Sequence, residues 1–428
     1  MTNSYLSKNS KKHWKKSLKL IPDGVQTLSK MPSKYVEGIY PIYLEQGKGC
    51  YVSDREGNLF IDYPLGLGAI LLGHNYPAVT NAVMERLKQG NIFTLPSYQE
   101  TILAEKLHSL VSCCEMVRFL KTGSEATSAA IKIARSYTKR EGIAFCGYHG
   151  WHDWFTVSTP KNSGIPLCYK DLIHKFEFNN IDSLIDIFTR QQERIAAVII
   201  EPCIFEEPKN NFLKKVAEIT RKNGALLIFD EVVTGFRFPK YSVQRYLNVT
   251  PDLATFGKAM GNGIPISCVC GKTKYMKELE KDCFVSSTFG GDLIGITAVL
   301  ETIKVLENNN VIDHIWFLGE YLKDGYNEIA KNLGIDTQCI GYPNRTFHKF
   351  PTAVHKTLFW QECIRRGVFF GYAQFICYSH TQKDIDYTLE VIRDSLKILK
   401  DNWSNPEKVL GGKVAEEVFR LIVTKQGN

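Results

Sequence analysis

The chain has 428 residues, of which 44% are hydrophobic and 23% charged, and its formal net charge is +8. This length allows a large core and two or three structural units, and the composition is ordinary for a soluble globular protein. No apolar stretch reaches the ~18 residues of a membrane-spanning helix, and the start lacks the apolar segment of a signal peptide. We therefore expect no membrane association.

The twelve cysteines are scattered along the chain. The close pairs are Cys113–Cys114 and Cys268-x-Cys270, and there is no Cys-x-x-Cys pattern. This spacing argues against a structural zinc site and a disulfide framework, and it favours the reducing cytoplasm. We expect a cytoplasmic protein without a bound metal.

The start of the chain is basic. A lysine-rich segment can bind nucleic acid or a membrane surface. This one has a single tryptophan, few other apolar residues and no arginine, so we interpret it as a solvated helical lead-in and expect no nucleic-acid partner. Its lysines are Lys8, Lys11, Lys12, Lys15, Lys16 and Lys19.

Strands and helices alternate along most of the chain. The segment 43–62 is typical of strands joined by a hairpin, and 63–74 of a glycine-rich loop packed against a ligand or a partner subunit. The β-α-β order in the next part of the chain predicts a parallel sheet with right-handed crossovers, hence an α/β fold. We expect strands near 117–121, 143–146, 196–200, 225–229 and 264–271, and helices near 77–89, 98–112, 124–139, 210–222 and 293–307.

Two segments contain residues that are typical of a catalytic site. The apolar run 225–229 ends in Asp230 and Glu231, as a buried parallel strand does when polar residues stand at its carboxyl end, where ligands bind. Further along, Lys258 lies between Gly257 and Gly261, where a backbone can approach a ligand closely. Pyridoxal phosphate (PLP) needs a lysine to hold its aldehyde as a Schiff base and an anion beside its ring nitrogen. Lys258 and Asp230 fit these two roles.

A third segment, Thr122-Gly123-Ser124-Glu125, stands at a predicted helix start. Free backbone N–H groups, a hydroxyl and the positive end of the helix dipole make such a start a phosphate site. The plain alternative is an N-cap in which Ser124 closes the first turn. With Asp230 and Lys258 in the same chain, we favour the phosphate.

These motifs resemble the class III aminotransferases, and within them the subgroup of glutamate-1-semialdehyde 2,1-aminomutase. The shared patterns are Asp-Glu-Val-x-Thr-Gly-Phe-Arg from Asp230 and Pro-Asp-Leu-x-Thr-x-Gly-Lys ending at Lys258. The resemblance implies fold type I, with a large domain built on a mostly parallel sheet flanked by helices and a small α+β domain. We expect an N-terminal segment over 1–62, the PLP-binding domain over 63–308 and the small domain over 309–428.

The resemblance also implies roles around the cofactor. Tyr148, next to His149, matches the residue that stacks on the pyridine ring, and Val232 matches the residue on the opposite face. Thr288 matches a threonine that reaches the phosphate of a neighbouring subunit, which implies a homodimer with shared active sites. A threonine in a plain turn is the alternative for Thr288. The expected cofactor-binding residues are Gly123, Ser124, Tyr148, His149, Asp230, Val232, Lys258 and Thr288.

The chain departs from the aminomutase where that enzyme holds its substrate. Lys30 replaces an arginine, which is not equivalent because arginine pairs bidentately with a carboxylate. Leu67 replaces a tryptophan, and Ile376 replaces an acid. The segment after Glu201 differs as well. We assign Lys30, Leu67 and Glu201 as candidate substrate residues.

The sequence therefore predicts an intermolecular PLP-dependent aminotransferase. Lys258 is the catalytic lysine and Asp230 its partner, with a pyridoxamine phosphate intermediate between an amine donor and a carbonyl acceptor. Glutamate is a candidate donor, and a sugar-derived carbonyl is a candidate acceptor. The first alternative is the aminomutase itself, which moves nitrogen within one substrate for tetrapyrrole synthesis. The second is a non-catalytic binding module of the same fold, and the complete pair of Asp230 and Lys258 argues against it.

Overall fold

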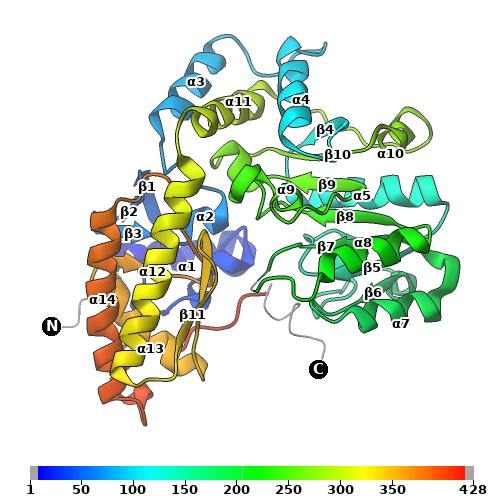
Figure 1. Cartoon of the computed structure of the whole chain (residues 1–428). Helices are drawn as coiled ribbons and strands as arrows, with labels where there is room; N and C mark the ends of the chain where they lie inside the picture. The colour runs from blue at the N-terminus through cyan, green and yellow to red at the C-terminus, as the bar shows by residue number, and fades with distance from the viewer. Residues whose placement is uncertain (1–7, 205, 420–428) are drawn as a thin grey trace. The chain divides into compact units, whose positions relative to one another are not determined.

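The computed structural model describes residues 8–204 and 206–419. They form two compact units (Figure 1). One unit is continuous in sequence and spans 77–312, and the other joins 8–76 to 313–419. No helix among the described residues is long and apolar enough to cross a membrane.

The continuous unit is built on a seven-stranded sheet with the order β4-β10-β9-β8-β7-β5-β6. Neighbours from β6 to β9 are parallel, whereas β10 runs antiparallel to both β9 and β4. The expected α/β fold with a mostly parallel sheet is confirmed. The strands are β4 (Met116–Leu120), β5 (Gly142–Cys146), β6 (Ile173–Lys175), β7 (Ile195–Ile200), β8 (Leu226–Asp230), β9 (Leu253–Phe256) and β10 (Ser267–Gly271).

The central strands β5, β7, β8 and β9 are buried along their whole length. This explains their nearly continuous apolar sequences, because a strand covered on both faces has no polar side. Helix α5 packs across β7 to β10, while α7 and α8 pack on each other. The longer helices of this unit are α3 (Pro77–Lys88), α4 (Tyr98–Leu110), α5 (Gly123–Thr138), α7 (Ile181–Gln191), α8 (Phe212–Lys222) and α11 (Leu293–Asn308).

The other unit joins the two ends of the chain. Strand β3 (Leu59–Asp62) pairs in parallel with β13 (Val368–Phe369), about 300 residues later, and completes the sheet β1-β2-β3-β13. A second sheet, β11-β12-β14, is antiparallel. The predicted division at 62/63 and 308/309 stays a prediction. The other elements are α1 (Lys8–Leu20), β1 (Leu44–Lys48), β2 (Tyr51–Asp54), β11 (Gln338–Tyr342), β12 (Arg345–Lys349), α13 (Ala353–Ile364), β14 (Gln374–Phe375) and α14 (Gln382–Asp401), with α12 (Val311–Leu333) leading into the unit.

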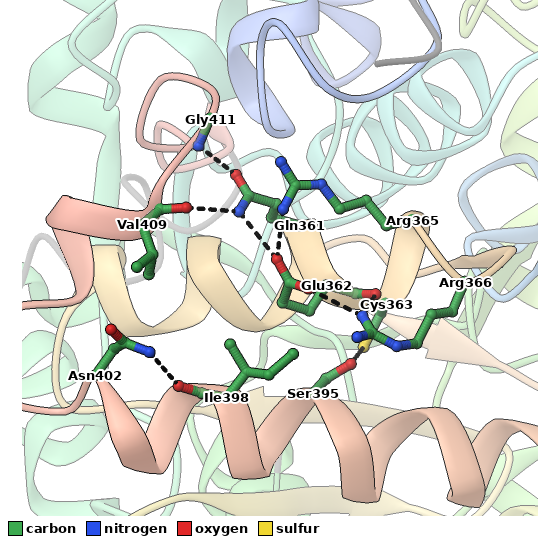
Figure 2. Close-up of polar contacts among 10 residues, drawn as sticks. All are labelled: Gln361, Glu362, Cys363, Arg365, Arg366, Ser395, Ile398, Asn402, Val409 and Gly411. Carbon is green, nitrogen blue, oxygen red and sulfur yellow. Dashed lines mark hydrogen bonds and ion pairs between the residues drawn. The ribbon is translucent and has the colours of Figure 1, made fainter. Parts of the chain in front are cut away.

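A polar cluster on α13 fixes the segment after α14 (Figure 2). The buried Gln361 side chain donates to the Val409 carbonyl at 3.0 Å and accepts from the Gly411 amide at 2.7 Å. Beside it, the Glu362 carboxylate pairs with two arginines of the next turn, at 2.7 and 2.9 Å. The amide side chain thus satisfies backbone groups that have no partner in a helix or sheet.

A half-buried histidine packed among aromatic rings makes this unit sensitive to acid. His348 stacks on Tyr326 with a centroid distance of 4.7 Å and meets the ring edges of Phe359 and Phe370. Burial among these rings lowers the pKa of His348 to about 3. The native state therefore holds the imidazole neutral, whereas the unfolded chain binds a proton below about pH 6.5.

We predict that the free energy of unfolding falls as the pH drops from about 6.5 toward 3, by up to about 1.4 kcal/mol per pH unit from His348. In His348→Phe this part of the pH dependence of the unfolding free energy disappears. Denaturant titrations at pH 7, 6 and 5 measure it, with the exposed His13→Asn as the control. An equal slope in wild type and His348→Phe would contradict the assignment.

Candidate active site

The candidate site lies at one edge of the seven-stranded sheet. Strands β4, β5, β7, β8 and β9 all point the same way, so their carboxyl ends share this edge. Ligands of open α/β sheets bind outside these ends. The residues that the strands deliver here are Gly123 and Ser124 after β4, Tyr148 and His149 after β5, Glu201 after β7, Asp230 at the end of β8 and Lys258 after β9.

The Asp230 carboxylate is buried and accepts three hydrogen bonds. His149 Nδ1 lies 2.8 Å from Oδ2, and it is the donor because a carboxylate can only accept. The amide of Val232 and the hydroxyl of Thr255 donate to Oδ1 at 3.1 and 3.2 Å. Among the described residues, no lysine or arginine forms an ion pair with Asp230. A buried acid without a cationic side chain suits a ligand that brings a positively charged N–H group.

Helix α5 begins with a complete capping box. The Thr122 hydroxyl accepts from the Glu125 amide at 3.2 Å, and Glu125 Oε2 accepts from the Thr122 amide at 2.7 Å. The helix itself offers no partner to the first amides, those of Gly123 and Ser124. The cap therefore fixes the helix start and leaves the two amides and the dipole for an anion.

The loop after β5 packs directly over this helix start. The Trp151 amide donates to Ser124 Oγ at 3.2 Å, and a Cβ on Gly150 would overlap that oxygen. Gly150 also has φ +106°, a conformation that favours glycine. Only glycine therefore lets the loop approach Ser124 this closely.

Val232 lies close both to the start of α5 and to the turn that carries Lys258. A Cβ on Gly123 would lie 2.8 Å from Val232 Cγ1, and one on Gly257 would lie 3.6 Å from the same atom. Lys258 follows Gly257 with φ +46°, which is unusual for a residue with a side chain. Such strain occurs at sites where the surrounding structure enforces it, and here the buried Ala259 and Met260 hold the turn.

Glu201 contacts the backbone of the loop that carries the aromatic residue. Its Oε1 accepts from the Tyr148 amide at 2.7 Å, and a Cβ on Gly147 would lie 2.9 Å from the Glu201 side chain. The Tyr148 ring meets Phe155 edge to face, with centroids 5.4 Å apart. The fold thus gives Glu201 a structural contact, and its predicted role toward substrate stays a prediction.

The remaining predicted residues lie elsewhere. Thr288 is exposed and lines a cavity of about 630 Å³ with residues of 91–97 and β4. Lys30 and Leu67 belong to the other unit and line a cavity there. Two further residues of the site, Thr255 and Gly150, were not predicted from the sequence. Thr255 belongs to the motif that ends at Lys258, but its hydroxyl contact depends on the pairing of Asp230 with Thr255 across β8 and β9.

No group of three or more histidine, cysteine or acidic side chains in the described part of the chain is arranged to hold a metal ion. The site instead combines a helix start with two amides that have no partner within the helix, a buried carboxylate, a half-buried lysine and an aromatic residue. This donor set fits PLP: Gly123 and Ser124 suit its phosphate, Asp230 its ring nitrogen and Lys258 its aldehyde.

Comparison with known proteins gives an independent result. The family model "Aminotransferase class-III" matches residues 33–337. The chain is 37% identical over 396 residues to a 3-aminobutyryl-CoA aminotransferase of Cloacimonas acidaminovorans, covering 89% of this chain and 95% of that protein. It is 34% identical over 425 residues to glutamate-1-semialdehyde 2,1-aminomutase 2 of Lachnoclostridium phytofermentans, covering 91% and 99%.

Solved structures share the fold. The FumI protein of Sphingopyxis sp. MTA144, in its form with PLP, matches with a TM-score of 0.88 at 24% identity, over 94% of this chain and all of that one. An omega-transaminase of Sphaerobacter thermophilus matches with a TM-score of 0.83 at 24% identity, over 91% and 97%. The expected fold type I architecture is confirmed.

Gly150 provides a test of the helix start. We predict that Gly150→Ala weakens PLP binding by about tenfold or more, because the methyl group displaces Ser124 from the phosphate position. Gly164 is the matched control, since its φ is also positive (+87°) but a Cβ there meets nothing within 4 Å. Both variants lose about 1 kcal/mol or more of stability from backbone strain, and only Gly150→Ala loses affinity in a fluorescence titration with PLP. Equal affinities would contradict this account of the phosphate site.

Proposed function

This chain belongs to the class III aminotransferases, PLP-dependent enzymes, and we propose that it transfers an amino group between two separate molecules. An amine donor, with glutamate as the first candidate, gives the nitrogen, and a carbonyl acceptor collects it. The observation that carries the proposal is that the buried Asp230 and the strained, half-buried Lys258 both lie at the carboxyl ends of neighbouring strands of one sheet.

PLP supplies, when bound, a ring that withdraws electrons from the substrate carbon. In our proposal Asp230 places a negative charge beside the ring nitrogen, and His149 and Thr255 orient its two oxygens. Gly123 and Ser124 bind the phosphate. Tyr148 and Val232 cover the two ring faces.

Lys258 has two roles in this proposal. Its Nζ would be the attachment point for the cofactor, and as a neutral amine the same atom would accept a proton from the substrate carbon and return it to the C4′ carbon of the cofactor. The positive φ of Lys258 and its buried neighbours support this assignment, because they restrict where the side chain starts. A base that the protein holds in one position has a higher effective concentration at the substrate carbon than a base that moves freely.

The departures from the aminomutase pattern favour an intermolecular reaction. Lys30, Leu67 and the buried Ile376 replace an arginine, a tryptophan and an acid of that pattern. The relative named 3-aminobutyryl-CoA aminotransferase supports this reading and makes a coenzyme A thioester a candidate substrate, beside a sugar-derived carbonyl. The second candidate remains glutamate-1-semialdehyde 2,1-aminomutase, the name of relatives that are 31–35% identical.

We also propose a homodimer in which Thr288 of one subunit reaches the phosphate site of its partner. Thr288 lies in an exposed segment. Large apolar side chains nearby are exposed as well, as interface residues are in an isolated subunit. They include Phe93, Leu95, Phe284 and Phe289.

The proposal predicts a half-reaction with glutamate. Mixing the PLP-loaded protein with glutamate shifts the cofactor absorbance to that of pyridoxamine phosphate and releases 2-oxoglutarate. Lys258→Ala slows this conversion by at least about 10²-fold, the scale of a lost general acid–base catalyst. The exposed Lys274→Ala is the control and keeps the wild-type rate.

Other outcomes decide between the candidates. If glutamate leaves the spectrum unchanged and glutamate semialdehyde becomes 5-aminolevulinate, the chain is the aminomutase. A wild-type protein that retains no cofactor absorbance after reconstitution would contradict both candidates.

A further inference from the structure

A large cavity lies within the unit formed by 8–76 and 313–419. Its volume is about 880 Å³, near the upper end of the ~300–1,000 Å³ of small-molecule sites. Lys30 and Leu67, two residues predicted to face the substrate, both line it. Helix α1 (blue in Figure 1) contributes Lys11 and Trp14 to the wall.

The wall includes several aromatic side chains. Trp14 is half-buried and packs on Gly24, where a Cβ would overlap the indole ring. Tyr43 is held by a 3.0 Å hydrogen bond between its hydroxyl and Ser17 Oγ. Tyr35 stacks on Tyr40 with centroids 5.4 Å apart. Fixed rings around a cavity suit a flat aromatic group, because stacking adds to the burial of apolar area.

Two lysines at this cavity are not engaged by acidic side chains. Lys413 pairs with Glu37 at 3.1 Å, and His74 pairs with Asp62 at 2.8 Å. Glu45 is the third acid of the lining. Within residues 8–204 and 206–419, none of Lys11, Lys30 and Glu45 forms an ion pair, so the unpaired charges of the lining are two ammonium groups and one carboxylate.

Helix α1 adds to this positive charge. Lys15 lies one turn beyond Lys11 on the same side of the helix, and both are exposed. An ammonium group binds phosphate as a point charge, whereas a planar carboxylate is best held by an arginine fork. The lysine at position 30 therefore gives up bidentate binding of a carboxylate and keeps a point charge that can bind a phosphate.

We infer that the cavity binds a nucleoside diphosphate carried by the substrate, with the base against the aromatic wall and the diphosphate against Lys11 and Lys30. As a substrate site, this inference rests on the proposed aminotransferase function. Coenzyme A and nucleotide-linked sugars both contain this group. The two carriers differ in the base and in the group attached at the far end of the diphosphate.

Calorimetric titration of the PLP-loaded full-length protein tests the inference. The probes are coenzyme A, UDP-N-acetylglucosamine and inorganic pyrophosphate. We expect one of the two nucleotides to bind more tightly than pyrophosphate. Lys11→Ala and Lys30→Ala each weaken that binding about tenfold, the scale of a lost charged hydrogen bond. Lys16→Ala is the matched control, because Lys16 is exposed on the same helix but does not line the cavity, and it changes the affinity less than about twofold.

Each outcome has a separate meaning. Coenzyme A binding that depends on both lysines indicates a thioester substrate, and UDP-N-acetylglucosamine binding that depends on them indicates a nucleotide sugar. Three results would overturn the inference. They are no nucleotide binding below millimolar concentration, nucleotide binding no tighter than that of pyrophosphate, and nucleotide binding that Lys11→Ala and Lys30→Ala leave unchanged. If the glutamate half-reaction proceeds in the same batch, the proposed function survives that failure. Lysine-dependent binding without the half-reaction keeps the nucleotide site and overturns the function.

Discussion

The site depends on one buried carboxylate. Asp230 is nearly inaccessible, and burying a charge is costly unless donors surround it. The fold provides those donors from three segments: His149 after β5, the Val232 amide after β8 and Thr255 on β9. Each requires its strand in the correct register. The parallel order of β5, β7, β8 and β9 therefore sets the chemistry, because a shift of one residue would turn Thr255 to the other face of the sheet.

Much of this arrangement was predictable because it is encoded locally. The apolar runs before Glu201 and Asp230 predict buried strands, and the segment from Thr122 to Glu125 predicts a helix start; β7, β8 and α5 stand there. The features that the sequence could not supply are non-local. The pairing of β3 with β13 joins residues about 300 apart, and the three-residue β6 is too short to produce a pattern. The hydrogen bond from Tyr148 to Glu201 and the positive φ of Lys258 likewise arise only from the packed fold.

The two units divide the features that define the enzyme. The continuous unit carries every residue proposed to hold PLP, and these match the patterns shared by aminotransferases and aminomutases. The discontinuous unit carries Lys30, Leu67 and Ile376, where the chain departs from the aminomutase pattern. The family model covers parts of both units, since it matches residues 33–337, whereas these three replaced positions all lie in the discontinuous unit.

The central claim is that Asp230 holds the ring nitrogen of PLP in its protonated form. Loading the protein with PLP labelled with ¹⁵N at the ring and recording the nitrogen chemical shift tests it directly. The account predicts a protonated ring nitrogen in the wild type and in Lys274→Ala, and an unprotonated one in Asp230→Ala at neutral pH. A wild-type spectrum with an unprotonated nitrogen, or a protonated nitrogen that persists in Asp230→Ala, would contradict it.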